Sequence, residues 1–412
     1  MADGQINLKL TRENKKLSTI RLSDRVQRIK PSPTLAVSTR ARELRAEGKD
    51  VIGLGAGEPD FDTPDHIKAA AIKAIQDGFT KYTAVDGTPG LKQAIIDKFK
   101  RDNGLDYAAD QILVSAGGKH SFFNLAQALL NEGDEVIIPA PYWVSYPDMV
   151  LLADGKPVII EAGIEQHFKI TPDQLATAIN ERTRLFVINS PSNPTGVAYN
   201  KAELGALGDV LKQYPQVLIA TDDMYEHILW ADEPFNNIVT ACPDLFDRTI
   251  VLNGVSKAYS MTGWRIGYAG GPKTLIAAMK KIQSQSTSNP TSIAQVAAQA
   301  ALSGDQGCIS PMLKAFKQRH DHVVQRLNNL EAVRCLPADG TFYAFPDFRQ
   351  VIANNKHVSN DVELAEYMLN EAGVALVPGS AFGAEGYLRL SFATSMEQLD
   401  ASLDRLELLL SK

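Results

Sequence analysis

The feature of this sequence that most restricts its fold is an alternation of short apolar runs with longer amphipathic segments. Because the runs are almost continuously hydrophobic, they indicate strands buried on both faces, as in a parallel sheet between helices. The segments between them, such as residues 120–135 and 201–215, have helical spacing and end at glycine or proline. The sequence therefore predicts an α/β fold. The runs, in chain order from residue 51, are VIGLGAG, QILVSAGG, EVIIPAPYW, KPVIIEA, RLFVINSPSNPTG, QVLIATDDMY and TIVLNGVSK.

After residue 310 the pattern changes to that of a smaller α+β unit. A long charged helix is predicted over 312–332, short strands near GTFYAFPDF and EGYLRLSFA, and a last helix over 396–411. Residues 20–50, with a helix after Pro33, are expected to join this unit. We therefore expect a tail at 1–18, a small-domain segment at 19–65, a large domain with a mostly parallel seven-stranded sheet at 66–310, and the rest of the small domain at 311–412.

Charge and cysteine usage exclude several classes of protein. The formal net charge of -6 provides no basic surface for nucleic acid or for an anionic membrane. No apolar run reaches the roughly 18 residues of a membrane-spanning helix. Cys242, Cys308 and Cys335 are widely spaced and form neither a metal-ligand nor a disulfide pattern. We therefore expect a cytoplasmic protein without a metal site, whose partners are small molecules.

Polar and aromatic side chains follow most of the predicted strands. In an open α/β sheet, ligands bind beyond the carboxyl ends of the strands. Each group alone has an ordinary explanation, such as a solvated loop lysine or a turn. Together they place an amine, a carboxylate, an amide, a phenol, an aromatic plate and an anion pocket at one sheet edge. The residues are Gly118 and Lys119 after ILVS, Trp143 after EVIIPA, Asn193 after LFVINS, Asp222 and Tyr225 after VLIAT, and Ser256, Lys257 and Arg265 after TIVLNGV.

This set of groups matches the chemical needs of pyridoxal 5'-phosphate. A lysine amine can hold its aldehyde as an imine, and a buried carboxylate can keep its ring nitrogen protonated. An amide and a phenol can hydrogen-bond its phenolic oxygen, and an aromatic side chain can stack on its ring. A helix N-terminus and an arginine can bind its phosphate. The sequence therefore predicts a pyridoxal-phosphate enzyme.

Five motifs resemble those of the class I aminotransferases of pyridoxal-phosphate fold type I. The subgroup resembled is the bacterial-type aspartate aminotransferases of subclass Iβ, and the resemblance covers nearly all of residues 19–412. It implies a homodimer with shared active sites that transfers an amino group, by a ping-pong mechanism, between aspartate/oxaloacetate and glutamate/2-oxoglutarate. The motifs are SAGGK, SPSNPTG, TDDMYEHI, SKAYSMTGWRIGY and YLRLSFA.

The resemblance also implies roles for individual residues. Lys257 binds the cofactor and moves the substrate proton, Asp222 pairs with the ring nitrogen, and Tyr225 and Asn193 bond the phenolic oxygen. Trp143 stacks on the ring and borders the substrate together with Asn193. The phosphate group is bound by the amides of Gly118 and Lys119, by Ser256 and Arg265, and by Tyr82 of the other subunit. Gly254 is a departure, since other subgroups often place a phosphate-binding serine there.

On the substrate side, the resemblance implies that Arg389 binds the α-carboxylate and that Gly57 lies close by. Animal-type enzymes bind the distal carboxylate with an arginine of the neighbouring subunit, but residues 284–292 contain no arginine. In subclass Iβ this role is linked to the lysine of GGK. Lys119 therefore has two assignments, its amide to the phosphate and its ammonium to the distal carboxylate. The KPSPT segment is implied to assist through Lys30, Ser32 and Thr34.

Two alternatives stay open, and a third is not expected. The nearest is an aminotransferase that acts on prephenate or aromatic amino acids, alone or in addition to aspartate, because the N-terminal positions named above are implicated in prephenate use. A second is a pyridoxal-phosphate lyase or synthase on the same fold. A transcription regulator would need a DNA-binding domain of about 60 residues ahead of the fold. Only 18 residues precede the resemblance, so we do not expect one.

Overall fold

A seven-stranded sheet lies at the centre of the chain, of which the computed structural model describes residues 20–31 and 33–411. Its strand order is β2-β8-β7-β6-β5-β3-β4, and neighbouring strands are parallel except where β8 pairs with β2 and β7. This confirms the predicted mostly parallel sheet of seven strands. The strands are β2 (Ile112–Ser115), β3 (Glu135–Ala140), β4 (Lys156–Glu161), β5 (Thr183–Asn189), β6 (Leu218–Asp222), β7 (Thr249–Gly254) and β8 (Gly267–Gly270).

Six of the seven apolar runs form strands of this sheet, and the run at residues 51–57 does not. Its strand β1 (Ile52–Gly53) pairs in parallel with β10 (Val374–Ala375) instead. The seventh strand is β8, whose sequence Gly-Tyr-Ala-Gly has no β-branched residue and gives no strand signal. A Cβ at Gly267 would lie 2.2 Å from the backbone nitrogen of Gly118, so this close approach requires glycine.

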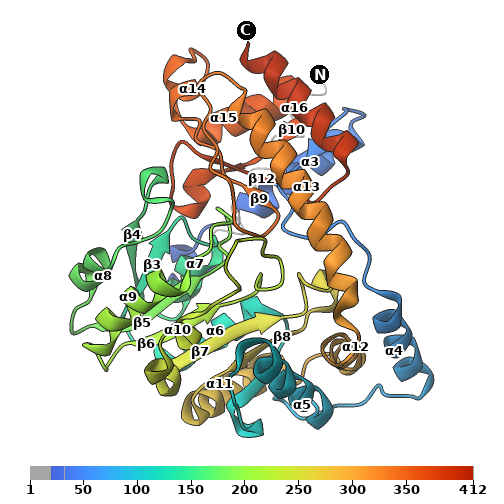
Figure 1. Cartoon of the computed structure of the whole chain (residues 1–412), viewed down its shortest axis with the longest axis vertical. Coiled ribbons are helices and arrows are strands. Elements are labelled where there is room, and N and C mark those ends of the chain that lie inside the picture. Colours follow the sequence, from blue (N-terminus) through green and yellow to red (C-terminus); the bar gives the residue numbers. More distant parts are fainter. Residues whose placement is uncertain (1–19, 32, 412) are drawn as a thin grey trace.

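Helices cover both faces of the sheet (Figure 1). Alternate residues of β5 point into two different apolar layers: Phe186 and Ile188 into one, Leu185 and Val187 into the other. This two-sided burial explains why the strands are continuously hydrophobic. The helices are α4 (Asp65–Gln76), α5 (Pro89–Lys98), α6 (Gly118–Leu129), α7 (Ser145–Leu152), α8 (Pro172–Ala178), α9 (Lys201–Lys212), α10 (Ile238–Ala241), α11 (Lys273–Ser286) and α12 (Ser292–Ser303).

A second, antiparallel sheet, in the order β11-β12-β9, lies above the carboxyl ends of the large sheet (Figure 1). Its core contains Ile52 and Leu54 from the N-terminal part together with Phe316, Leu390 and Leu403, so both chain ends share one apolar cluster. The strands are β9 (Tyr343–Ala344), β11 (Val377–Pro378) and β12 (Leu388–Ser391), and the helices are α3 (Pro33–Ala46), α13 (Ile309–Asn328), α14 (Arg349–Asn354), α15 (Asp361–Tyr367) and α16 (Met396–Leu410).

The short helix α2 (Asp24–Arg28) lies against α7 and not against this second sheet. Arg25 and Arg28 both form ion pairs with Asp154, just after α7. None of the helices in the described ranges is long and apolar enough to cross a membrane. The expected tail at 1–18 and Ser32 lie outside the described residues.

Candidate active site

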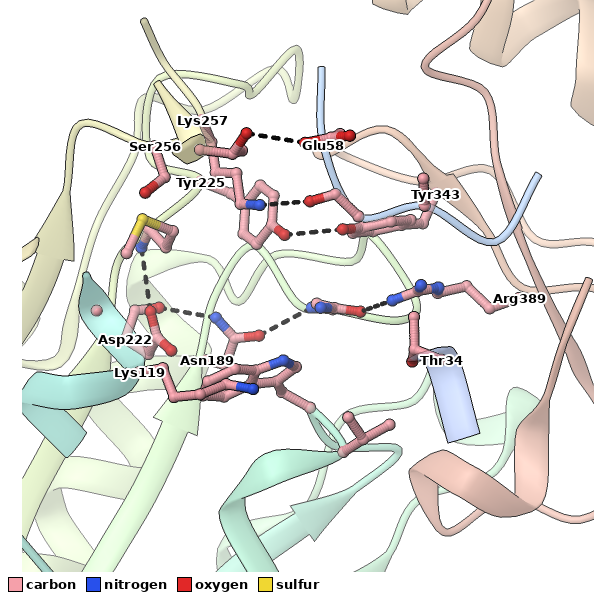
Figure 2. A pocket seen from close by; sticks show the side chains of 18 of the residues that line it. Thr34, Glu58, Lys119, Asn189, Asp222, Tyr225, Ser256, Lys257, Tyr343 and Arg389 are labelled. Atoms are coloured by element: carbon pink, nitrogen blue, oxygen red, sulfur yellow. Dashed lines mark hydrogen bonds between the residues drawn. The ribbon is translucent and has the colours of Figure 1, made fainter. Parts of the chain in front are cut away.

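A cavity of about 470 Å³ opens at the carboxyl ends of the large sheet, beneath the second sheet (Figure 2). This volume lies in the range of small-molecule sites. Strands β6 and β7 contribute the residues that follow them, β12 contributes Arg389, and α3 contributes Thr34. Of the residues expected from the sequence, Thr34, Gly57, Gly118, Lys119, Trp143, Asn193, Asp222, Tyr225, Ser256, Lys257, Arg265 and Arg389 line this cavity.

Two expected residues lie elsewhere. Tyr82 is 89% exposed and does not line the cavity of its own chain. Lys30 is also exposed and lies beside Asp148 on α7, outside the cavity. The structure therefore gathers the expected groups from the sheet edge around one cavity, whereas Lys30 and Tyr82 lie outside the cavity of their own chain.

Lys257 follows the end of β7 and points its Nζ across the cavity. Nζ donates a 2.5 Å hydrogen bond to the carbonyl oxygen of Gly57. Burial and the nearby Arg389 lower the pKa of Lys257 to about 8, while Glu58 acts in the opposite direction. A lysine in such a site is partly an unprotonated amine near neutral pH, so it can act as a nucleophile or a base.

Asp222 is the last residue of β6, and three groups hold it in place. The hydroxyl of Tyr146 donates to Oδ2 at 2.5 Å, the amide of Met224 donates to Oδ1 at 3.3 Å, and Asn189 Nδ2 donates to the Asp222 carbonyl at 2.8 Å. Burial raises the pKa of Asp222, and the Tyr146 hydrogen bond opposes that change. Asp222 is therefore a buried carboxylate that a cation in the cavity would stabilise further.

An anion pocket forms where α6 begins. Gly117 has φ +89°, and a Cβ there would lie 2.3 Å from Nη2 of Arg265, so the guanidinium packs directly over the turn. Gly118 and Lys119 are the first residues of α6, so their amide N–H groups have no partner within the helix and can bind an anion. Arg265 is held by the carbonyl of Thr262 at 2.8 Å. With Ser256 also lining the cavity, this end has the groups that bind a phosphate.

Arg389 lies at the opposite end of the cavity and is almost completely immobilised. Nη1 donates to Oδ1 of Asn193 and Nη2 to the carbonyl of Gly55, both at 2.8 Å. The guanidinium lies 4.4 Å from the ring centre of Tyr343 and 4.9 Å from that of Phe382. Its Nε is buried and has no hydrogen-bond partner among the described residues. A fixed guanidinium with a free N–H is suited to bind a carboxylate.

Sequence reasoning missed several residues of the site. Tyr146 lies in the first turn of α7 and has the pattern of a core residue of that helix. Tyr343 comes from β9, far along the chain, and only the fold brings it to Tyr225. Asn189 lies four residues before Asn193, and the backbone amide of Asn193 donates to Asn189 Oδ1 at 2.8 Å. The available signal for Asn189 was its position at the end of an apolar run.

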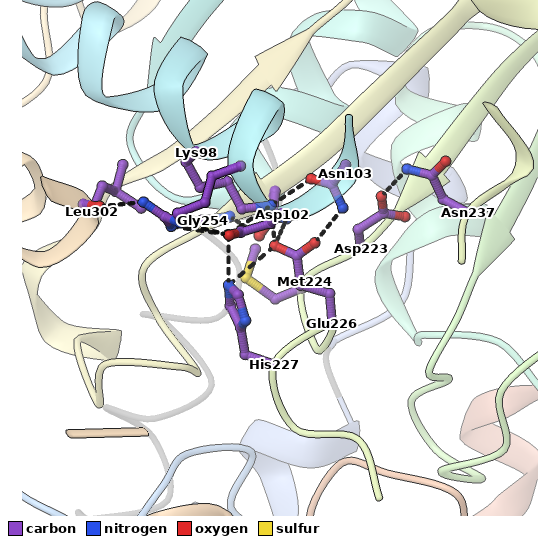
Figure 3. A network of polar contacts seen from close by, with 12 residues as sticks. Lys98, Asp102, Asn103, Asp223, Met224, Glu226, His227, Asn237, Gly254 and Leu302 are labelled. Carbon is purple, nitrogen blue, oxygen red and sulfur yellow. Dashed lines mark hydrogen bonds and ion pairs between the residues drawn. The ribbon is translucent and has the colours of Figure 1, made fainter. Parts of the chain in front are cut away.

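A buried polar network lies beneath the site (Figure 3). The ammonium of Lys98 is fully buried and forms an ion pair with Glu226. Glu226 also accepts from Asn103 at 2.9 Å and from Asn253 at 2.8 Å, and Asn253 accepts from the amide of Gly254 at 2.7 Å. The network joins the end of α5 to the turns that follow β6 and β7.

Part of this network has the geometry of a metal site. One ligand atom each of Asp102, Glu226 and His227 lies within 4.8 Å of the others. The Lys98 ammonium already pairs with Glu226 and lies 3.8 Å from Asp102. A lysine thus supplies the positive charge that these carboxylates need, which is the arrangement of a structural ion pair.

Residues 49–406 match the family model described as aminotransferase class I and II. The chain belongs to this family. Known aminotransferases match it along almost its whole length. An aspartate/prephenate aminotransferase of Nitrosomonas europaea is 63% identical over 397 residues, which is 95% of this chain and 100% of that protein. One of Cereibacter sphaeroides is 56% identical over 94% of this chain and 98% of its own length.

Solved aminotransferases share the fold as well. The aspartate aminotransferase of Rhizobium meliloti matches with a TM-score of 0.92 and 46% identity, over 95% of this chain and 99% of the other. The aspartate aminotransferase of Thermus thermophilus, solved with maleate, matches with a TM-score of 0.90 and 42% identity, over 95% and 100%.

The aminotransferase family implies pyridoxal phosphate, and the cavity of this aminotransferase fits that group. A reactive amine, a buried carboxylate, an aromatic plate and an anion pocket line one space of suitable size. The glycines at the start of α6 leave room that a Cβ would fill, since a Cβ at Gly118 would lie 2.5 Å from Met224 Cε. The donors and acceptors present thus correspond to the parts of the cofactor.

Proposed function

We propose that this aminotransferase uses pyridoxal 5'-phosphate to transfer an amino group between aspartate/oxaloacetate and glutamate/2-oxoglutarate. The observation that supports the proposal most is the arrangement of Lys257, Asp222 and Arg389 around one cavity. An amine, an acceptor for a pyridinium and a fixed carboxylate-binding group all face the same space.

The bound cofactor supplies an electron sink that stabilises negative charge at the substrate Cα and keeps the amino group between the two half-reactions. Lys257 would hold it through Nζ, Asp222 would bond the ring nitrogen, and Trp143 would stack on the ring. Asn193 and Tyr225 would bond the phenolic oxygen. The phosphate would be bound by Gly118, Lys119, Ser256 and Arg265.

The amino-acid substrate would bind with its α-carboxylate on Arg389. The free Nε of Arg389 is buried and needs an acceptor, so an incoming carboxylate removes an unsatisfied donor. Asn193 and Gly57 then border the substrate backbone. Once the substrate amine has displaced Nζ from the cofactor, Lys257, whose pKa is about 8, would take the proton from Cα and pass it to the cofactor, and would move a proton in the opposite direction in the second half-reaction. The second sheet closes over this end and limits the access of water.

Lys119 supports a preference for acidic substrates. The side chain is exposed at the cavity mouth with its Nζ 5.2 Å from the ring centre of Trp143, and partial desolvation together with Arg265 lowers the pKa of Lys119. An ammonium held in this way gains most from a carboxylate partner. Thr34 lines the same cavity and can donate a hydrogen bond. Lys30 would assist only if the segment before α3 moved inward.

Prephenate is the second candidate substrate, used in addition to aspartate. The Nitrosomonas and Cereibacter relatives described above are named aspartate/prephenate aminotransferases. Prephenate also has a carboxylate at a distance from its keto acid end, so Lys119 and Thr34 suit it as they suit aspartate. Aromatic amino acids lack that distal carboxylate and are expected to react more slowly.

We also propose a homodimer with two domains in each subunit. Apolar side chains of α4 and the loop after it face solvent: Ile72 and Ile75 are 55% exposed and Phe79 is 39% exposed. A partner subunit would cover them and receive Tyr82 in its phosphate pocket. The domains would comprise residues 66–310 and, together, 19–65 and 311–412. The three cysteines are unpaired, which supports a cytoplasmic location.

The absorbance spectrum of the purified protein, before and after aspartate is added, tests the proposed function. We expect an absorption band of the bound cofactor that changes with aspartate and is restored by 2-oxoglutarate. Lys257→Ala should abolish turnover but retain the fold. Steady-state rates over a panel of keto acids that includes prephenate then rank the substrates. A protein that binds no cofactor, or a Lys257→Ala variant with full turnover, would contradict the proposal.

A further inference from the structure

Tyr343 is a fully buried residue of the cavity wall, and no sequence motif indicates a role for it. It is the first residue of β9 and lies opposite Ser391 in β12. From this position it contacts groups at both ends of the site. Its hydroxyl lies 3.0 Å from that of Tyr225, and its ring packs against the guanidinium of Arg389 (Figure 2).

The hydroxyl of Tyr343 is confined on the other side as well. A Cβ at Gly57 would lie only 2.9 Å from this oxygen, so the hydroxyl packs against the glycine backbone. The carbonyl of Gly57 in turn accepts from Lys257. The only hydrogen bond of the Tyr343 side chain in the described part of the structure is the one to Tyr225.

The number of available hydrogens determines the direction of the hydrogen bond between Tyr343 and Tyr225. Burial raises the pKa of Tyr343 and raises that of Tyr225 well above its ordinary value, so both stay neutral and each has one hydrogen. If Tyr225 gives its hydrogen to the phenolic oxygen of the cofactor, as the proposed function requires, the shared hydrogen between the phenols must come from Tyr343. Tyr225 then accepts from Tyr343 and donates onward. A hydroxyl that accepts a hydrogen bond becomes a stronger donor.

We propose that Tyr343 is a positioning residue that fixes and polarises the hydroxyl of Tyr225 while its ring supports Arg389. One side chain from the second sheet therefore sets the placement of a cofactor-binding group and a substrate-binding group together. The inference rests on the proposed function, because it assigns the hydrogen of Tyr225 to the bound cofactor.

The two parts of the Tyr343 side chain can be separated by substitution. Tyr343→Phe removes the hydroxyl and keeps the ring under Arg389, so the Michaelis constant for aspartate should change by less than about threefold. Tyr343→Leu removes the ring as well and should raise that constant by about tenfold. A role confined to folding would not distinguish these two variants in this way.

The decisive measurement is the pH titration of the absorbance of the bound cofactor. The nitrogen that joins Lys257 to the cofactor carries a proton, and the phenolic oxygen of the cofactor stabilises that proton by accepting a hydrogen bond from it. A hydrogen bond donated by Tyr225 to the same oxygen weakens this stabilisation. If Tyr225 donates more weakly, the proton is held more tightly and the pH midpoint of the spectral change rises. For Tyr343→Phe we expect a rise of about 0.2 to 0.6 pH unit. The dissociation constant of the cofactor, from equilibrium dialysis, should rise by a few-fold at most.

A double-mutant cycle with Tyr225→Phe shows whether the effect passes through Tyr225. In that background, Tyr343→Phe should leave the midpoint unchanged. Tyr107→Phe is the matched control, because Tyr107 is buried, does not line the cavity and has a hydroxyl that meets no hydrogen-bond partner within the described ranges. It should not move the midpoint in either background.

The outcomes separate this inference from the proposed function. An unchanged or lowered midpoint in Tyr343→Phe, or an equal rise in the Tyr225→Phe background, would overturn the positioning role while the wild type still transaminates. A wild type without a bound cofactor or a spectral transition would contradict the proposed function itself. Thermal unfolding of each variant confirms that the compared proteins are folded.

Discussion

The hydroxyl of Tyr146 donates a 2.5 Å hydrogen bond to Oδ2 of Asp222. Tyr146 is buried and Asp222 is half-buried, and burial raises the pKa of Tyr146 well above its ordinary value, so the proton stays on the phenol. Tyr146 lies on α7, three residues after Trp143, and the two rings meet edge to face with centres 5.1 Å apart. Tyr146, in the first turn of α7, thus contacts both the ring of Trp143 and the carboxylate of Asp222.

Tyr146→Phe is expected to lower kcat by roughly 10- to 100-fold, the cost of one hydrogen bond to a charged group. Without this donor, burial raises the pKa of Asp222 further, so Asp222 is protonated over a wider acidic range. The acidic limb of the pH profile of kcat/KM should therefore move to higher pH. Tyr199→Phe, which removes a buried hydroxyl that bonds the amide of Ile170 instead of Asp222, is the control. An acidic limb that stays in place would contradict the role given to Tyr146.

Arg389→Lys is expected to reduce kcat/KM for aspartate by roughly 100-fold or more, mainly through a higher KM. The lysine keeps the charge but loses the planar fork that Asn193 and Gly55 hold in place. Arg349→Lys, on the surface beside Asp347, should have little effect and serves as the matched control. Steady-state kinetics of both variants provide the measurement, and an unaltered KM in Arg389→Lys would remove Arg389 from the carboxylate site.

Lys119→Met is expected to raise KM for aspartate and glutamate by roughly 10- to 100-fold. KM for phenylalanine, which has no distal carboxylate, should change little. Lys30→Met should have a smaller effect than Lys119→Met, because Lys30 lies outside the cavity. Equal losses for acidic and aromatic substrates would instead assign Lys119 to the phosphate alone. The comparison requires only kinetics over a small panel of amino acids.

Lys257→Met is expected to stabilise the cofactor-free protein at pH 7 by about 3 kcal/mol. The pKa of Lys257 falls from 10.5 to about 8 on folding, so the unfolded chain binds more protons between these values. Stability of the wild type therefore rises with pH across that window, and the cost of the ammonium is complete below pH 8. Urea unfolding at pH 7 and pH 10.5 should show a difference that disappears at the higher pH. A difference independent of pH would contradict this account.

Lys98→Met is expected to destabilise the protein by about 3 kcal/mol, because it leaves Glu226 buried without its cation. Burial raises the pKa of Glu226, but Lys98 outweighs it and holds the pKa below its usual range. The contribution of Glu226 is therefore present above its ordinary pKa and is lost as the pH falls through the folded value. Adding Glu226→Gln to Lys98→Met should recover part of the loss at pH 7, as urea unfolding would show. A double variant less stable than Lys98→Met would argue against the pair.

The strand ends allowed most of the site to be predicted from the sequence. Lys257, Asp222 and Asn193 all follow continuous apolar runs, and parallel strands bring such positions to one edge. The run at 51–57 is also apolar, but its strand pairs with Val374–Ala375. A short apolar run indicates a strand without indicating which sheet the strand joins. Strand β8 was not predicted, since close approach to α6 requires glycine at Gly267.

The residues that were not predicted support other site residues from within the core. Tyr146 and Tyr343 are fully buried aromatic side chains, and the sequence pattern around them is that of ordinary packing. Their hydroxyl partners, Asp222 and Tyr225, lie 76 and 118 residues away along the chain. Local periodicity contains no information on contacts of such separation, so only the three-dimensional arrangement identifies them.

The way Arg389 is held has a consequence for how such an enzyme can change over evolution. Each of its two Nη atoms donates one hydrogen bond to the protein, and Nε has no partner among the described residues, so the end that binds the α-carboxylate is fixed before any substrate arrives. Thr34 and Lys119, elsewhere on the cavity rim, take no part in that fixation. Substitutions at the rim can therefore broaden or narrow the range of accepted side chains while the amino-acid end stays unchanged, and new substrate specificities can arise by a few mutations in a scaffold whose catalytic machinery is conserved.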